Sequence, residues 1–177
     1  MKHKITLILG GARSGKSAYA EKLATDSGLP VTYIATAQIY DDEFKARVQH
    51  HKDRRPANRM LVEEPHRLTQ TLARLAEPNQ CLIIDCLTVW LAQWLCADCN
   101  PPTNSSWQLE REAFLTLLPT LPGTIILVSN EVGMGIVPLG EINRQFQDEQ
   151  GRLNQAVAGL ADEVVFVAAG LPLKLKG

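Results

Sequence analysis

Four residues near the start of the chain have the types and spacing that can hold a polyphosphate. Gly10, Gly15, Lys16 and Ser17 fit the pattern G-x-x-x-x-G-K-[ST], with apolar residues before it and helix-forming residues after it. In such a loop the backbone N–H groups converge on phosphate oxygens, the lysine reaches the outer phosphates, and the serine hydroxyl can ligate magnesium. We therefore predict a nucleotide-binding loop here, and an ordinary glycine turn is the less favoured alternative.

An acidic residue follows a second apolar run. Asp85 ends the run at 81–85, and a loop of this kind needs an acid at the end of a neighbouring strand to organise magnesium. Asp85 could equally cap a helix over 87–95. Glu63 and Glu64 end another apolar run, and they could bind a base, a hydroxyl or a metal, or simply be solvated.

Two adjacent histidines lie in a strongly basic stretch. The basic residues around His50 and His51 are Arg47, Lys52, Arg54 and Arg55. On a helix, His50 projects together with Arg47 and Arg54, whereas His51 falls nearer an apolar stripe. A run of charges is usually a solvated helix face. Beside a phosphate-binding loop, however, an imidazole can attack phosphorus as a nucleophile, and spacing alone does not choose between the two histidines.

The segment 129–138 follows an apolar run and contains two glycines. It should emerge at the carboxyl edge of the sheet, where folds of this class bind ligands. A purely structural connection is equally compatible with its composition.

Length, charge and cysteine usage limit the remaining possibilities. A chain of 177 residues predicts one domain over 1–177, and 18 basic against 19 acidic residues give no excess positive charge for nucleic acid. We expect no membrane span and a cytoplasmic location, because no signal or sufficiently long apolar run is visible.

The four cysteines fall into two pairs. Cys81 and Cys86 fit small core residues. Cys96 and Cys99 have C-x-x-C spacing, but no second ligand pair supports a metal or redox site.

The elements that must position these residues alternate along the chain. Apolar, β-branched runs predict strands over 4–9, 31–37, 59–64, 81–86, 124–130 and 163–170. Helical patterns occupy 16–28, 41–55, 87–95, 105–118 and 140–161, the fourth opening with a serine cap. This alternation predicts an α/β fold like that of P-loop nucleoside triphosphate hydrolases, with a mostly parallel sheet and helices on both faces.

An ordered set of segments along most of the chain resembles the bifunctional adenosylcobinamide kinase / adenosylcobinamide-phosphate guanylyltransferase family of cobalamin biosynthesis. The segments are GGARSGKS (10–17), YIATAQIYDDEFKARVQHHKDRRP (33–56), EEP (63–65), DCLTVWL (85–91), SNEVGMGIVP (129–138) and GRLNQAVAGLADEVVFVAAGLPLKLKG (151–177). Relatives often carry a tryptophan shortly after the "RP", where this chain has Arg59.

The resemblance implies two reactions. ATP or GTP phosphorylates adenosylcobinamide; GTP then guanylylates a histidine, and the GMP passes to adenosylcobinamide phosphate to give adenosylcobinamide-GDP. It implies His50 as the guanylylated catalytic residue, corrinoid and nucleotide substrates, and a homo-oligomer, typically a trimer. The loop motif itself predicts Lys16 as a catalytic residue and Mg²⁺ on Ser17 and Asp85. The implied nucleotide contacts are Gly10, Gly11, Ala12, Arg13, Ser14, Gly15, Lys16, Ser17, Ala35, Thr36, Ala37, His51, Lys52, Asp53, Arg54, Glu63 and Asp85.

Two alternatives come from the residues themselves. One is another P-loop kinase for a small metabolite, in which the histidines are incidental. The other is a nucleotide-sensing binding module without turnover. A switch GTPase is disfavoured, because the chain has no N-K-x-D tetrad for guanine.

Overall fold

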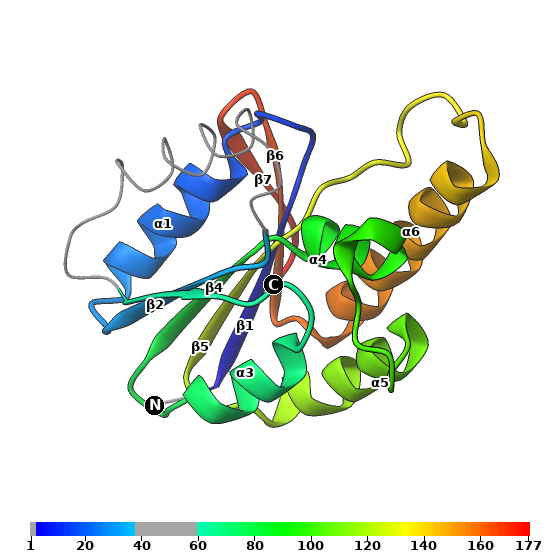
Figure 1. The fold of residues 1–177 in the computed structure, drawn as a ribbon. Coiled ribbons are helices and arrows are strands. Elements are labelled where there is room, and N and C mark those ends of the chain that lie inside the picture. Colours follow the sequence, from blue (N-terminus) through cyan, green and yellow to red (C-terminus); the bar gives the residue numbers. More distant parts are fainter. Residues whose placement is uncertain (1–2, 38–59) are drawn as a thin grey trace.

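A single seven-stranded sheet carries the helix at Lys16–Asp26 on one face and the other described helices on the opposite face (Figure 1). The computed structural model describes residues 3–37 and 60–177. The strand order is β3-β2-β4-β5-β1-β6-β7. The strands are β1 (Lys4–Leu9), β2 (Val31–Ala35), β3 (Met60–Glu63), β4 (Cys81–Asp85), β5 (Thr124–Val128), β6 (Glu163–Ala168) and β7 (Leu171–Lys176). The helices are α1 (Lys16–Asp26), α3 (Leu68–Leu75), α4 (Leu87–Leu95), α5 (Trp107–Leu117) and α6 (Glu141–Leu160), with short 3₁₀ turns at Ala97–Cys99 and Leu118–Thr120.

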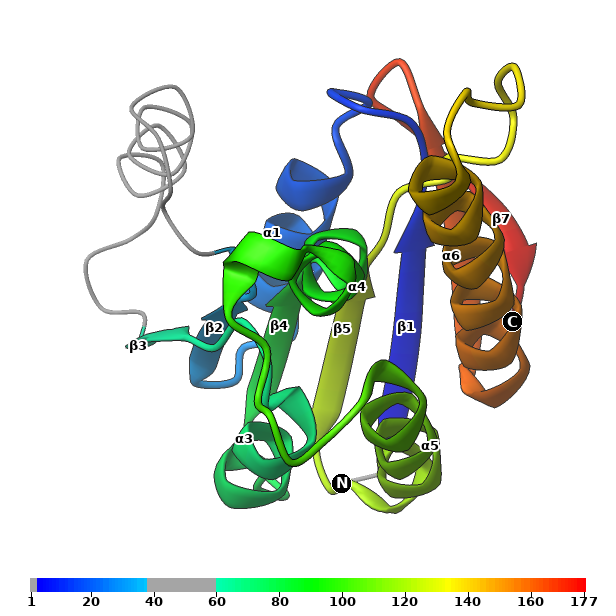
Figure 2. The same cartoon turned by 45° about the vertical axis from the view of Figure 1, so that its right-hand side comes forward.

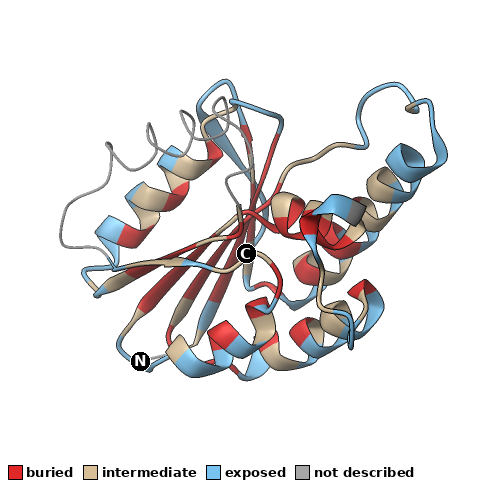
Figure 3. Ribbon diagram, in the orientation of Figure 1, coloured by how far each residue is buried: buried red, intermediate tan, exposed pale blue. Residues whose placement is uncertain are grey.

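The pairing of the strands confirms the predicted α/β class. All neighbouring strands are parallel except β6 and β7, which form an antiparallel hairpin. The central strands are apolar on both faces because helices cover both, and burial is concentrated there (Figure 3).

Residues of each strand alternate between two apolar cores. Ile8, Ile83 and Val128 pack on one face with Ala20 and Ala24 of α1. The opposite face carries the larger core, which includes Leu7, Ile84 and Leu127 and is covered by α3, α4, α5 and α6 (Figure 2). Because side chains alternate along a strand, the face of each residue near the strand ends follows from these two sets.

The structure adds two elements to those expected. Helix α3 and strand β7 were absent from the sequence-based prediction. Of the apolar residues at helical spacing in α6, Leu153 and Val157 are buried, whereas Ile142 and Leu160 are exposed. Ser106 caps α5 as expected, its hydroxyl accepting from the Leu109 N–H at 3.3 Å. The helix predicted over 41–55 lies outside the described residues.

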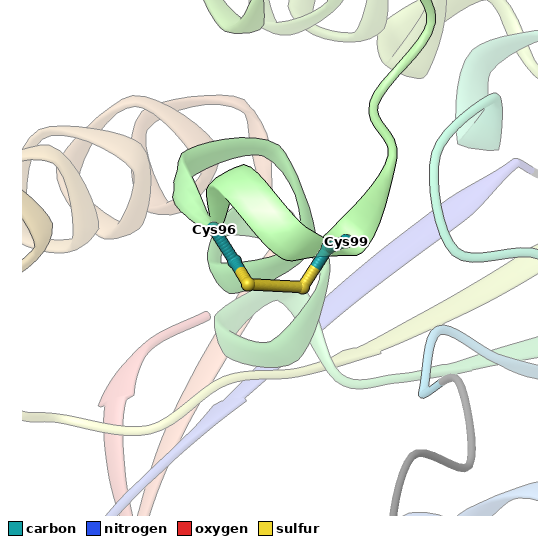
Figure 4. The surroundings of a disulfide bond; sticks show 2 residues. All are labelled: Cys96 and Cys99. Carbon is teal, nitrogen blue, oxygen red and sulfur yellow. A yellow bond between two sulfur atoms is a disulfide. The ribbon is translucent and has the colours of Figure 1, made fainter.

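Cys96 and Cys99 form a disulfide bond just beyond the end of α4 (Figure 4). Cys81 and Cys86 lie outside this disulfide and are buried, as expected of small core residues. Within residues 3–37 and 60–177 no three potential metal ligands of the His, Cys, Asp or Glu type cluster together. Over the same residues, no helix combines the length and apolar character that a membrane span requires.

Candidate active site

The glycine-rich loop after β1 makes a tight turn into α1. Gly10 and Gly15 have φ of 150° and 101°, and Arg13 between them has φ of 55°. The Ser14 N–H donates to the Gly11 carbonyl at 3.3 Å. Helix α1 begins at Lys16 with no side-chain cap. The N–H groups of its first turn are therefore available to an anion, as the motif predicts.

Lys16 is held inside this loop. Its Nζ donates to the Gly11 carbonyl at 2.5 Å and to Ser14 Oγ at 3.4 Å. Burial lowers the pKa of Lys16 below its ordinary value, while the nearby charge of Asp85 opposes that shift. The ammonium group thus lies inside the loop, within range of the Asp85 charge, and can neutralise a bound phosphate.

The turn between β6 and β7 braces the loop from the other side. The Gly170 N–H donates to the Ser14 carbonyl at 2.8 Å. A Cβ at Gly10 would lie 2.3 Å from the Val167 carbonyl oxygen, and one at Gly15 would lie 3.1 Å from Gly170 Cα. Figure 2 shows the blue loop and the red turn at the same end of the sheet. These close approaches explain why glycine is needed at both positions.

The predicted site residues on the other strands share one row and one face. Ala35 pairs with Glu63 on one side and with Asp85 on the other, and Asp85 pairs in turn with Val128. Each lies an even number of residues from a side chain in the α1-side core, so all project toward the face that carries α1 and its loop. The structure therefore brings Ala35, Glu63 and Asp85 to the edge where the glycine-rich loop lies.

Asp85 is oriented by a tyrosine that the sequence analysis missed. The Tyr33 hydroxyl donates to Asp85 Oδ2 from the neighbouring strand. The alternative that Asp85 caps α4 is wrong, because the cap is Cys86, whose sulfur accepts from the Val89 N–H at 3.4 Å. Burial raises the pKa of the Cys86 thiol to about 12, which keeps it neutral. The available signal was spacing, since Tyr33 lies two residues before Ala35 on the same strand face.

Thr36 fixes the backbone beside this carboxylate. It is fully buried, and its hydroxyl donates to the Cys86 carbonyl at 2.7 Å while accepting from the Cys86 N–H at 2.9 Å. Its own N–H donates to the Asp85 carbonyl at 3.3 Å. Ala37, next along the chain, is half-buried. The predicted nucleotide contacts of Thr36 and Ala37 remain predictions.

The two glutamates at the end of β3 have different surroundings. Glu63 is exposed at the end of the strand. Glu64 turns back to the start of α3, where its carboxylate accepts from the N–H groups of His66 and Arg67 at 3.0 and 2.7 Å. Glu64 is therefore a structural residue, whereas Glu63 lies at the strand end beside Ala35. The predicted His50, His51, Lys52, Asp53 and Arg54 lie outside the described residues.

Comparison with known proteins fits this geometry. The sequence profile of the family described as "Cobinamide kinase / cobinamide phosphate guanyltransferase" matches residues 6–175. The chain belongs to this family. A bifunctional adenosylcobalamin biosynthesis protein, CobP of Pseudomonas aeruginosa, is 54% identical over 171 residues, which cover 97% of this chain and 96% of CobP. CobU of Salmonella typhimurium, which carries the same description, is 40% identical over 179 residues, covering 96% of this chain and 98% of CobU.

The cobinamide kinase / guanyltransferase family thus accounts for the whole set of segments singled out in the sequence. Among solved structures, an ATPase from a bacterial type III secretion system superimposes with a TM-score of 0.52 at 12% identity, covering 97% of this chain and 56% of the ATPase. At that identity the likeness establishes the P-loop fold alone. Family membership favours the two-reaction interpretation over an unrelated small-metabolite kinase or a nucleotide-sensing module.

Proposed function

We propose that the protein uses one phosphate-binding site in the cytoplasm for both activities of its family. In the first, ATP or GTP phosphorylates adenosylcobinamide. In the second, GTP forms a GMP adduct on His50, and the GMP then passes to adenosylcobinamide phosphate to give adenosylcobinamide-GDP. The observation that carries this proposal is the loop at Gly10–Ser17, inside which the Gly11 carbonyl and Ser14 hydroxyl hold the Lys16 ammonium group.

The two reactions break different bonds of the triphosphate that the same loop holds. In the kinase step, the substrate hydroxyl attacks the γ-phosphorus, the bond to the bridging oxygen breaks, and a nucleoside diphosphate leaves. In the guanylyl step, an imidazole nitrogen of His50 attacks the α-phosphorus and pyrophosphate leaves. Lys16 and the loop N–H groups stabilise the charge on the leaving group in both cases.

The residues present suit Mg²⁺. Ser17 is half-buried in the first turn of α1 and offers a hydroxyl oxygen, and Asp85 offers a carboxylate that Tyr33 orients. Oxygen donors of this hard type are those that Mg²⁺ prefers, and an outer hydrogen bond typically fixes such a carboxylate. Mg²⁺ bound there would neutralise phosphate charge during transfer.

Labelling with GTP tests the histidine step. Incubation with GTP labelled at the α-phosphate should attach GMP through a bond that acid cleaves and base does not, which identifies a phosphoramidate. His50→Ala should abolish labelling and retain kinase activity at least in part, whereas the neighbouring variant His51→Ala should still be labelled. Labelling that survives in His50→Ala and disappears in His51→Ala would overturn the assignment to His50.

Removing the lysine tests the shared phosphate site. Lys16→Ala should impair both phosphoryl transfer and GMP attachment, because both reactions develop charge on phosphates that the same loop holds. Normal GMP attachment in folded Lys16→Ala would refute the shared site and leave the histidine assignment standing.

We further propose a homo-oligomer, a trimer as the resemblance implies. Exposed apolar side chains gather in the segment after β5, and we assign this segment to the subunit interface. They are Met134, Ile136, Val137, Leu139 and Ile142.

Light scattering tests the oligomer and should give a molar mass about three times the 19.5 kDa of one chain. Ile136→Asp should lower that mass, whereas the control Leu109→Asp, on the exposed face of α5, should not. If Ile136→Asp still forms a trimer, the segment does not belong to the subunit interface.

A further inference from the structure

The parallel pairing of β5 with β1 continues beyond the end of both strands. The Ser129 N–H donates to the Ile8 carbonyl at 2.9 Å, and the Glu131 N–H donates to the Gly10 carbonyl at 3.1 Å. Both partners advance by two residues, so the register is unbroken. Asn130 therefore lies level with Gly10, the first glycine of the phosphate-binding loop.

Alternation along this extended segment sets the face of Asn130. Val128 packs in the α1-side core and Leu127 in the opposite core. Ser129 continues on the side opposite α1, where its hydroxyl donates to Asn154 Oδ1 of α6 at 2.7 Å. Asn130 is the next residue, so its side chain projects toward the face that carries α1 and its loop.

Side chains from two helices clamp the backbone of Asn130. Its N–H donates to Thr88 Oγ1 of α4 at 2.7 Å, and its carbonyl accepts from Asn154 Nδ2 of α6 at 3.1 Å. Gln150 completes the buried cluster by donating to Ser129 Oγ and to Asn154 Oδ1, both at 2.9 Å. The position of Asn130 therefore does not depend on its own side chain, and no hydrogen bond joins its carboxamide to another residue within 3–37 and 60–177.

We propose that Asn130 is a further catalytic residue, whose carboxamide N–H donates to the γ-phosphoryl group during the kinase step. The proposal rests on the phosphate site proposed above. Strand β5 lies between β1, which leads into the loop, and β4, which ends at Asp85. A donor at the end of β5 therefore projects beside the loop and beyond Asp85, toward the outer end of a polyphosphate. A neutral donor fixed before the reaction stabilises developing charge without reorganising.

Kinetics of three variants test this role. Asn130→Ala should lower kcat/KM for cobinamide phosphorylation about 100-fold, the typical effect of removing one preorganised donor. Asn130→Asp should be worse, because an ionised carboxylate repels the phosphate. The matched control Asn104→Ala changes an exposed asparagine in the turn before α5, and its kinetics should equal those of the unmodified protein.

Binding separates a catalytic role from a structural one. Asn130→Ala should weaken binding of a non-hydrolysable GTP analogue and leave GDP affinity and the melting temperature unchanged, because GDP lacks the γ-phosphoryl group. Equal losses for both nucleotides would show a structural role and overturn the proposal. Normal kinase activity in Asn130→Ala, together with impaired activity in Lys16→Ala, would refute the role of Asn130 and leave the proposed phosphate site standing. Normal activity in Lys16→Ala would refute the phosphate site itself.

Discussion

Gly10→Ala should disturb the phosphate-binding loop because the added methyl group has no room. Its Cβ would lie 2.3 Å from the Val167 carbonyl oxygen and 2.8 Å from Ser14 Oγ. Ser14 can rotate away, but the Val167 carbonyl belongs to the backbone of β6. In addition, φ at position 10 is 150°, which L side chains rarely adopt.

The expected cost follows from these two effects. An unfavourable φ costs about 1–2 kcal/mol and overpacking against backbone about 1–3 kcal/mol. The restricted unfolded chain offsets about 0.4–1 kcal/mol of this. We therefore expect the free energy of unfolding to fall by about 1–4.5 kcal/mol, which corresponds to a loss of about 2–18 °C in Tm for a chain of this length. Nucleotide affinity should fall as well, because the loop must shift to relieve the contact.

The next residue supplies the matched control. Gly11 lies in the same loop, and a Cβ there meets nothing within 4 Å. Thermal unfolding of Gly11→Ala should therefore stay close to that of the unmodified protein. If Gly10→Ala melts within 2 °C of it and binds GTP normally, or if Gly11→Ala loses as much, the contact with Val167 does not shape the loop.

Three further predictions concern other parts of the molecule. The hydrogen bond from Lys4 lowers the pKa of Glu163 below 4.5. The ionised carboxylate therefore stabilises the fold above pH 4.5, and this contribution is lost as the pH falls. In urea unfolding, Glu163→Gln should be less stable than the unmodified protein at pH 7, and the difference should shrink below pH 4.5. Because the pKa of Cys86 is about 12 and its side chain is buried, iodoacetamide at pH 8 should not label it in the folded protein, and rapid labelling seen by mass spectrometry would contradict this. Cys96→Ser should lower the free energy of unfolding by no more than about 2 kcal/mol under non-reducing conditions, because the bond to Cys99 closes a very short loop, and it should have no effect in reductant.

The central part of the fold was predictable because each buried strand shows itself as a continuous apolar run. β7 was missed because every residue in it is exposed and Pro172 interrupts its pattern, which an edge strand tolerates. α3 was missed because it has only eight residues and no standard cap residue. The Thr69 N–H in its first turn donates instead to the carboxylate of Glu110, which is distant in sequence.

The candidate site was predictable where one short segment supplies all the groups, as the glycine-rich loop does. Tyr33 and Asn130 depend instead on the register between strands that are distant in sequence. The sequence indicates that a strand is present but does not specify which residue of the next strand lies beside it. The role of Cys86 as the cap of α4 was also hidden, because a cysteine is not a usual cap residue.

The hairpin of β6 and β7 has a consequence for the order in which the site forms during synthesis. The loop at Gly10–Ser17 leaves the ribosome long before Val167 and Gly170, which brace it. A growing chain can pair β1 with β5 well before that point. We therefore expect nascent chains that lack β6 and β7 to collapse around the central strands without acquiring the ability to bind nucleotide.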